Sequence, residues 1–266
     1  MAYLQRDNGN VYFEDHGTGE TCVILVHGWG MNVRVWDATL VDLVDAGYRV
    51  VAMDHRGCGN SDKDFDDMGI SAIAGDVGAL IEHLGLGQVV LNGWSLGGAV
   101  VIEAASRFSD KVKAVVLTCG ASPIYVQKPD LALGGSAEDV AATVAALNSD
   151  RVVTLSAVAG AVCAMPVDPC LVQWMWLVFC EASPRAAVTL GQLADLDQRE
   201  MLGGLTQPIL SFIGEKDTFV APEICRWAAE NYSNIQSVEF EGCGHAPFIE
   251  VRERYLDELK TFLAAV

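Results

Sequence analysis

A glycine-rich motif, GWSLG at residues 93–97, carries the strongest chemical signal in the chain. Ser95 at its centre follows an apolar run expected to be a strand and precedes residues with helical spacing. A G-x-S-x-G motif in this setting is typical of a sharp strand-to-helix turn that holds a serine hydroxyl clear of a sheet. Only very small residues fit two positions before and after such a serine, where Gly93 and Gly97 stand. The pattern therefore predicts that Ser95 is a nucleophile.

A serine hydroxyl is a poor nucleophile by itself and needs a base, which in turn needs an acid to hold it. His245 is the best-placed base, because it lies in a glycine-rich loop (GCGHAPF) between the last expected strand and the last expected helix. Asp217 lies in GEKDTFV, directly after another expected strand, with Glu215 two residues away. We therefore expect Ser95, Asp217 and His245 to be catalytic. The alternatives are that His245 only begins a helix and that Asp217 only caps the next one.

Two backbone N–H groups are expected to stabilise the negative charge that acyl transfer places on a substrate oxygen. The sequence HGWG at residues 27–30 directly follows an apolar run, and Leu96 directly follows the candidate nucleophile. Paired N–H groups of this kind form the oxyanion hole of acyl-transfer enzymes. The sequence predicts that Trp29 and Leu96 supply them. We expect His27 to be a structural residue rather than a base.

Alternating strands and helices must position these residues. Runs of apolar residues without alternation are typical of strands buried on both faces of a parallel sheet, and the segments between them have helical spacing. Such runs occupy residues 22–28, 48–54, 89–95 and 112–118. A short hairpin is expected near the N-terminus, two further strands at 208–214 and 237–242, and a closing amphipathic helix across 248–262. The loop after the second run is expected to be braced by a pair between Asp54 and Arg56.

The alternation stops between residues 119 and 207. This stretch holds two strongly apolar segments, 152–165 and 170–180, separated by Pro166 and Pro169. Unstructured loops of this length are rare in compact domains, so helices are the better interpretation. We therefore expect a core domain made of residues 1–120 and 207–266, with a helical cap inserted at 121–206.

Aromatic residues in the motif and in the cap are candidates for binding an apolar substrate. They are Trp94, Trp174, Trp176 and Phe179. Such side chains often line small-molecule pockets. The alternative is that they only pack the cap onto the core or form the face of a homodimer.

Composition narrows the class of protein further. The chain has 266 residues, 51% of them hydrophobic, which is ordinary for one α/β domain. Lys and Arg number 17 against 35 Asp and Glu, a net charge of −18, which argues against nucleic acid as a partner. The longest apolar run is shorter than the roughly 18 residues that a membrane span needs. The N-terminus has no basic segment followed by an apolar one, and the eight cysteines are scattered. We therefore expect a cytoplasmic protein with reduced thiols and no membrane partner.

No metal or cofactor is expected. The sequence contains no H-E-x-x-H motif and no paired cysteine or histidine ligands. The chemistry expected of Ser95 needs neither.

The motifs HGWG, DHRGCGNSD, GWSLGG, GEKD and GCGHAPF occur in this order, and together they resemble the α/β-hydrolase superfamily over nearly the whole chain. The resemblance implies an eight-stranded, mostly parallel sheet flanked by helices. It also implies a catalytic triad of Ser95, Asp217 and His245, with Trp29 and Leu96 as oxyanion donors.

Within this superfamily, HGWGMNVRVW, GWSLGG and HAPF are most similar to the pimeloyl-carrier-protein methyl ester esterases. Those enzymes dock an acidic carrier through basic cap residues, whereas the cap here has only Lys128, Arg151, Arg185 and Arg199 amid comparable acid. The N-terminal third also resembles cofactor-free perhydrolases and lactonases. Perhydrolases commonly carry proline where this chain has Gly30.

The expected function is hydrolysis of a carboxylic ester or lactone of an apolar small molecule through an acyl-enzyme intermediate. Two alternatives use the same residues. One is hydrolysis of a carbon–carbon bond in a ring-cleavage product, and the other is a slow-turnover ligand-binding receptor.

Overall fold

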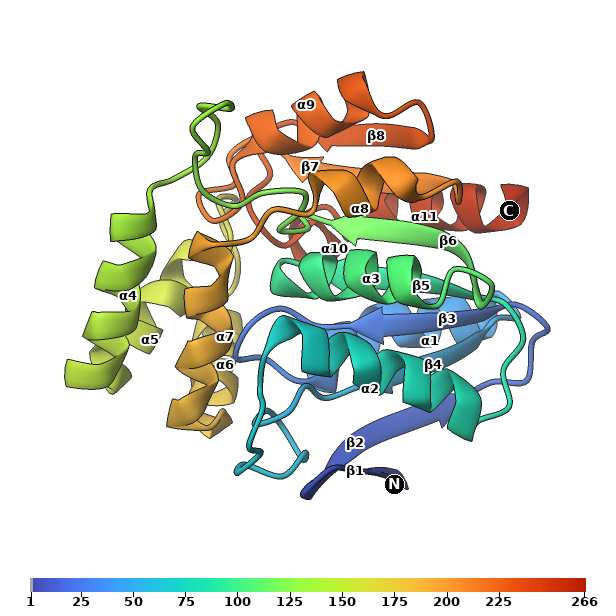
Figure 1. The fold of residues 1–266 in the computed structure, drawn as a ribbon, viewed down its shortest axis with the longest axis horizontal. Helices are drawn as coiled ribbons and strands as arrows, with labels where there is room; N and C mark the ends of the chain where they lie inside the picture. Colours follow the sequence, from blue (N-terminus) through green and yellow to red (C-terminus); the bar gives the residue numbers. More distant parts are fainter. Residues whose placement is uncertain (1) are drawn as a thin grey trace.

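In the computed structural model, which describes residues 2–266, eight strands form one sheet with helices on both faces (Figure 1). The order across the sheet is β1-β2-β4-β3-β5-β6-β7-β8. Strands β1 and β2 pair antiparallel, β2 joins β4 antiparallel, and all remaining pairs are parallel. The strands are β1 (Ala2–Arg6), β2 (Gly9–His16), β3 (Cys22–Val26), β4 (Arg49–Met53), β5 (Val89–Trp94), β6 (Val112–Thr118), β7 (Ile209–Gly214) and β8 (Ile235–Phe240). This confirms the predicted fold class.

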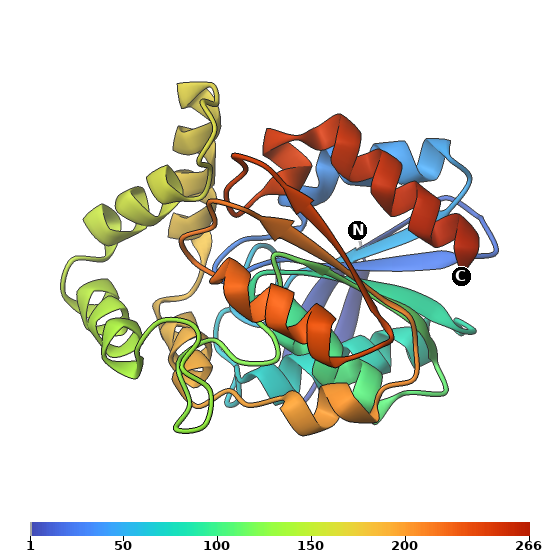
Figure 2. The same cartoon turned by 90° about the horizontal axis from the view of Figure 1, so that it is seen from above.

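Helices cover the sheet in two layers, as Figure 2 shows. On one face lie α1 (Asp37–Asp45) and α11 (Arg252–Ala265); on the other lie α2 (Ile70–His83), α3 (Leu96–Arg107), α8 (Arg199–Gly204) and α9 (Pro222–Asn231). Every residue of β3 is buried between these layers, which explains why its sequence has no polar alternation. The expected closing helix is divided, because α10 (Pro247–Glu250) ends at Val251, whose φ of −133° is not helical.

A helical lobe lies at the carboxyl ends of the central strands (Figure 1). It is formed by α4 (Ala137–Ser149), α5 (Arg151–Ala161), α6 (Pro169–Glu181) and α7 (Ala187–Gly191). Short 3₁₀ turns complete the fold at η1 (Val33–Trp36), η2 (Pro184–Ala186) and η3 (Gln192–Ala194). Helix α8 falls within the stretch expected to be cap, but it packs on core helix α3. We therefore propose that the cap ends before α8.

Two further observations concern membrane spans and thiols. Across residues 2–266, no helix combines the length and apolar character that a bilayer span needs. The eight cysteines are free thiols, five of them buried, including Cys22, Cys119 and Cys243.

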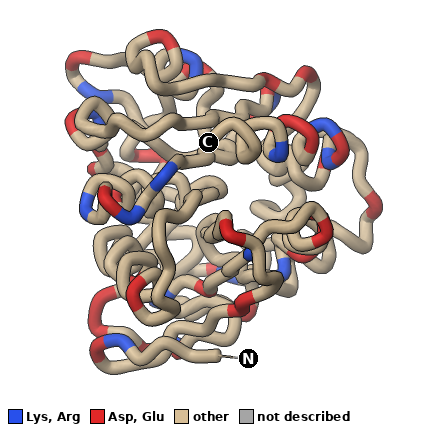
Figure 3. The backbone as a smooth tube through the Cα atoms, turned by 90° about the vertical axis from the view of Figure 1, so that its right-hand side faces the viewer, with Lys and Arg blue, Asp and Glu red and all other residues tan. Residues whose placement is uncertain are grey.

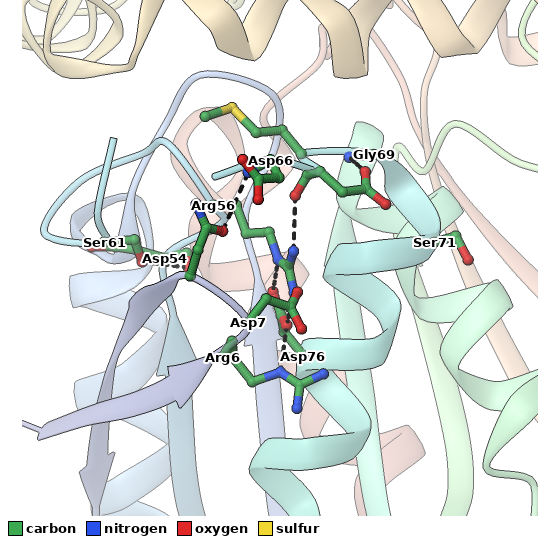
Figure 4. Close-up of polar contacts among 12 residues, drawn as sticks. Arg6, Asp7, Asp54, Arg56, Ser61, Asp66, Gly69, Ser71 and Asp76 are labelled. Carbon is green, nitrogen blue, oxygen red and sulfur yellow. Dashed lines mark hydrogen bonds and ion pairs between the residues drawn. The ribbon is translucent and has the colours of Figure 1, made fainter. Parts of the chain in front are cut away.

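The loop after β4 is not braced by a pair between Asp54 and Arg56, so that prediction was wrong (Figure 4). The Asp54 carboxylate instead accepts the backbone N–H groups of Val33 and Asn60, both at 2.7 Å. Arg56 reaches α2, where its Nε and Nη2 donate to the two oxygens of Asp76 at 2.6 and 2.7 Å. Backbone N–H groups already satisfy the Asp54 carboxylate. Arg56 therefore pairs with Asp76 instead and connects the loop to α2.

The Arg56–Asp76 pair also holds the N-terminal hairpin. Asp76 accepts a second hydrogen bond from Arg6 Nε at 2.8 Å, and Arg56 Nη2 lies 2.7 Å from Asp7. The side chains of Arg56 and Asp76 are 1% and 0% exposed. Removing one member of such a buried pair leaves the other charge poorly compensated.

We expect Asp76→Ala to lower the free energy of unfolding by about 3 kcal/mol, because the buried guanidinium loses its bidentate partner. Urea denaturation of both proteins measures this. The matched control is Asp64→Ala, whose side chain is 81% exposed and pairs with Arg185 on the surface. An exposed pair contributes little, so equal losses in the two variants would contradict the importance of the buried pair.

Candidate active site

The candidate nucleophile, Ser95, occupies the turn between β5 and α3 with a positive φ of 56° and a ψ of −124°. This region is unfavourable for a residue with a Cβ atom, so the surroundings must hold it. The Ser95 N–H donates to Thr118 O at 3.1 Å, and Ser95 O accepts the N–H groups of Gly98 at 2.8 Å and Ala121 at 2.7 Å. These hydrogen bonds from neighbouring segments hold the unfavourable backbone conformation of Ser95 in place.

The two flanking glycines are required by close packing. A Cβ atom at Gly93 would lie 2.7 Å from Val101 Cγ2 and would overlap the carbonyl of Gly97. A Cβ atom at Gly97 would overlap the carbonyl oxygen of Val26 and lie 2.7 Å from that of His27. The motif thus places the serine turn directly against the end of β3.

His245 and Asp217 are brought together as the sequence predicts. Asp217 Oδ2 lies 2.7 Å from His245 Nδ1, and the two residues are only 8% and 4% exposed. The other oxygen of Asp217 accepts the N–H groups of Phe219 at 2.8 Å and Val220 at 3.0 Å. An acid held by three donors in this way fixes the orientation of the imidazole and leaves His245 Nε2 free to act.

The ring of His245 is confined by aromatic side chains. It packs against Trp94 and Phe219, whose ring centroids are 5.5 and 5.0 Å away. The indole Nε1–H of Trp94 also donates to His245 O at 2.8 Å. No hydrogen bond joins Ser95 Oγ to His245 in this conformation of the described chain, although both residues line one cavity. Catalytic hydrogen bonds often close only when substrate binds.

The expected oxyanion donors line the same cavity. Leu96 is the first residue of α3, so its N–H has no partner within the helix. Within residues 2–266, neither this N–H nor that of Trp29 donates to another atom of the chain. A Cβ atom at Gly28 would lie 3.1 Å from Ser95 Cβ, so the loop that carries Trp29 lies directly against the serine.

His27 is buried and fixes this loop. Its Nδ1–H donates to Gly28 O at 2.7 Å, its Nε2 accepts the N–H of His55 at 2.9 Å, and the two imidazole rings stack at 3.8 Å. Burial lowers the pKa of His27 to about 4. The imidazole therefore stays neutral near pH 7, as both of its hydrogen bonds require.

A cavity of about 580 Å³ lies between the sheet and the cap, with Ser95 and His245 in its wall. Trp94 and Phe179 line it, as the sequence reasoning expected. Trp174 and Trp176, which were also expected to bind substrate, do not line this cavity. Trp176 instead packs toward α5, where its Nε1–H donates to Val152 O at 3.1 Å.

Sequence reasoning missed several apolar residues of the cavity wall. They are Tyr125, Val140, Val158, Val162, Leu190, Leu193 and Phe219. The position of Phe219 two residues after Asp217 is the one signal that could have identified a member of this set. The others come from cap segments whose apolar residues point in many directions.

One thiol lies beside the candidate acid and base. Cys119 Sγ and the ligand atoms of Asp217 and His245 all lie within 4.8 Å of one another. A zinc ion bound about 2.0–2.2 Å from nitrogen and oxygen ligands would need those two atoms further apart than 2.7 Å. The spacing therefore fits a hydrogen-bonded acid and base, and a metal ion would have to break that bond.

Comparison with known proteins gives the family. A sequence model described as the Alpha/beta hydrolase family matches residues 23–258. The chain belongs to the alpha/beta hydrolase family. This confirms the resemblance inferred from its motifs.

Relatives within the alpha/beta hydrolase family agree over nearly the full length. A pimeloyl-[acyl-carrier protein] methyl ester esterase from Aliivibrio fischeri is 30% identical, with 96% of this chain and 97% of that protein covered. Among solved structures, an esterase from Exiguobacterium antarcticum superposes with a TM-score of 0.94 at 26% identity, covering 98% of both chains. A bromoperoxidase from Bacillus anthracis gives a TM-score of 0.91 at 26% identity, covering 96% of both chains.

Proposed function

We propose that this alpha/beta hydrolase cleaves carboxylic esters or lactones of apolar small molecules through an acyl-enzyme intermediate. The observation that carries the proposal is the buried 2.7 Å hydrogen bond between Asp217 and His245 beside the strained turn of Ser95. The esterases among the relatives support the same reaction class.

In the first half of the reaction, Ser95 Oγ attacks the carbonyl carbon while its proton passes to His245 Nε2. Asp217 accepts the Nδ1–H hydrogen bond and stabilises the imidazolium. The backbone N–H groups of Trp29 and Leu96 stabilise the negative oxygen of the tetrahedral intermediate. His245 then gives its proton to the leaving alkoxide, and the acyl group remains on Ser95.

In the second half, a water molecule takes the place of the alcohol. His245 removes a proton from this water as it attacks the acyl carbon, and the same N–H groups hold the oxyanion. Collapse of the intermediate releases the carboxylic acid and returns the proton to Ser95 Oγ.

The wall of the cavity favours substrates without negative charge. Its apolar part is formed largely by the aromatic and aliphatic residues named above, and no Lys or Arg from residues 2–266 lines it. Asp139 and Glu223 do line it. An anionic group would lose hydration on entry and find no cation to pair with.

Each basic group of the stretch expected to be cap, residues 121–206, already has an acceptor or an acid beside it. Arg151 donates to Phe179 O and Ala182 O, and Lys128 donates to Ala194 O. Of the other two basic residues in the stretch expected to be cap, Arg185 pairs with Asp64, and Arg199, the first residue of α8, pairs with Asp130 and Asp197. Figure 3 shows acidic and basic residues interspersed around the periphery of the chain. We therefore propose a small molecule rather than a carrier-bound ester as the substrate.

The backbone at one position in the loop after β3 argues against perhydrolysis. Gly30 has φ +69°, and a Cβ atom there would lie 2.9 Å from Phe179 Cδ1. Proline fixes φ near −65°, so this backbone cannot hold the proline that perhydrolases commonly carry at the position of Gly30. Hydrolysis by water is the reaction that this loop supports.

We expect uncharged esters and lactones with medium apolar acyl groups to have kcat/KM values at least tenfold higher than matched esters with a terminal carboxylate, equivalent to about 1.4 kcal/mol. The esters share one leaving group, p-nitrophenol, whose release gives both the steady-state rates and the pre-steady-state burst that acyl-enzyme formation produces; ring opening of lactones is followed by the acid it releases. A higher kcat/KM for the anionic ester would contradict the charge argument. The absence of turnover for every ester and lactone would contradict the proposed function.

A further inference from the structure

Glu250, at the end of α10, gathers five hydrogen-bond donors on one carboxylate. Its Oε2 accepts the backbone N–H groups of Ala164 and Met165, both at 2.8 Å. The N–H of Gly244 lies 3.0 Å from both of its oxygens. The other donors to Oε1 are Ala246 N–H at 3.3 Å and the Cys243 thiol at 3.6 Å. A carboxylate carries about four lone-pair sites, which matches the four backbone N–H donors; the thiol at 3.6 Å is the longest contact and shares an oxygen with them.

These donors come from two segments that are distant in the sequence. Gly244 and Ala246 flank the candidate base on either side, whereas Ala164 and Met165 belong to the cap connector, residues 162–165, which follows α5. Neither pair of N–H groups lies within a helix or strand that would satisfy it. One side chain therefore joins the loop of His245 to the cap.

Direct contacts confirm that the two segments lie together. The N–H of His245 donates to Val162 O at 2.9 Å. A Cβ atom at Gly244 would lie 2.6 Å from Ala164 N, so only glycine allows this approach. The loop of His245 consequently rests on the cap connector and on Glu250, while Trp94 holds it from the sheet side.

We propose that Glu250 is a positioning residue that holds His245 at Asp217 by tying its loop to the cap connector. This role rests on the proposed function, in which His245 is the base. Glu250 touches neither substrate nor reacting atoms. It acts by fixing the N–H groups on both sides of the imidazole, and a displacement of about 1 Å at a catalytic group can cost 10²-fold in rate.

The test compares Glu250→Gln and Glu250→Ala with Glu253→Gln. Glu253 lies in the next helix, is exposed, and accepts no hydrogen bond from the described residues. Each variant is assayed well below its melting temperature with p-nitrophenyl acetate, which is too small to depend on the cap, and with p-nitrophenyl octanoate. Amide hydrogen exchange at Ala164 and Met165 is measured in parallel.

For Glu250→Gln we expect kcat to fall roughly tenfold or more, by the same factor for both esters. We also expect the backbone amides of Ala164 and Met165 to exchange their hydrogens faster. Glu250→Ala should lose more, and Glu253→Gln should match the wild-type protein. The proposal is overturned if kcat for p-nitrophenyl acetate stays within twofold of wild type. It is also overturned if the only change is a higher KM for p-nitrophenyl octanoate. Glutamine keeps one acceptor oxygen, so this variant tests the role even if the alanine variant does not fold.

The two proposals fail in different ways. A Ser95→Ala variant that still hydrolyses p-nitrophenyl acetate would overturn the proposed function. An inactive Ser95→Ala variant beside a fully active Glu250→Gln variant would overturn the role of Glu250 alone.

Discussion

Replacing Ser95 by alanine is expected to lower kcat for any ester substrate by roughly 10⁴–10⁶-fold. The hydroxyl is the only atom that can form the acyl-enzyme at this turn, and His245 has no other hydroxyl to activate in the proposed mechanism. Alanine has the same Cβ atom and can occupy the same backbone conformation, so the fold should be unchanged. Steady-state rates, together with labelling by a fluorophosphonate, measure the loss.

The matched control for this substitution is Ser109→Ala, an exposed serine just after α3. It should keep full activity and full labelling at Ser95. Equal melting temperatures for the wild-type protein and Ser95→Ala would show that the active site alone has changed. Near-normal turnover by Ser95→Ala would mean that the nucleophile has been assigned to the wrong residue.

Replacing Asp217 by asparagine is expected to lower kcat on the order of 10⁴-fold. The carboxylate accepts the Nδ1–H of His245 and leaves Nε2 unprotonated, ready to take the serine proton. Asparagine keeps the shape, but its amide N–H groups favour the opposite tautomer of the imidazole. It also removes the negative charge that stabilises the imidazolium formed during attack. One ester assayed at saturating concentration is enough to measure this effect.

Glu215→Gln is the comparison that makes this test decisive. Glu215 lies two residues away, but its carboxylate accepts the Gly242 N–H at 2.8 Å and pairs with Lys216 at 3.0 Å. It does not line the cavity. We expect this variant to stay within roughly tenfold of wild type, about 1.4 kcal/mol of barrier. An essential Glu215 beside a dispensable Asp217 would show that the acid has been placed on the wrong residue.

Features that depend on local sequence could be predicted well. The unbroken apolar run of β3 can only be satisfied by burial on both faces, which places this strand in the middle of a parallel sheet. The steric requirement for very small residues at Gly93 and Gly97 likewise identifies the turn of Ser95 from the sequence alone. The pairing of Asp217 with His245 follows because both residues come directly after strands at the same edge of the sheet.

Features that depend on competition among partners could not be predicted. Arg56 has several acids within reach along the sequence, and only the fold shows that Asp76 meets it while backbone donors occupy Asp54. Helix α6 is apolar around most of its circumference, so its sequence does not show which side faces the cavity. Phe179 therefore proves to be a lining residue and Trp176 does not. The role proposed for Glu250 depends on contacts that converge from two distant segments.

The attachment of the cap has a consequence for how such proteins can diversify. The inserted segment leaves the core just after the carboxyl end of β6 and rejoins it at α8, where the N–H of Gln198 donates to Pro123 O at 2.8 Å and the Ser122 hydroxyl donates to Gln198 Oε1 at 2.9 Å. An insertion whose ends lie so close together can be exchanged for another of different length without disturbing the strands that carry Ser95 and Asp217. Its freedom is limited at one place, because any replacement must still offer a carbonyl like that of Val162 and two N–H groups to Glu250. Descendants of one ancestor can therefore acquire new substrates by changing most of the cap while that short connector stays the same.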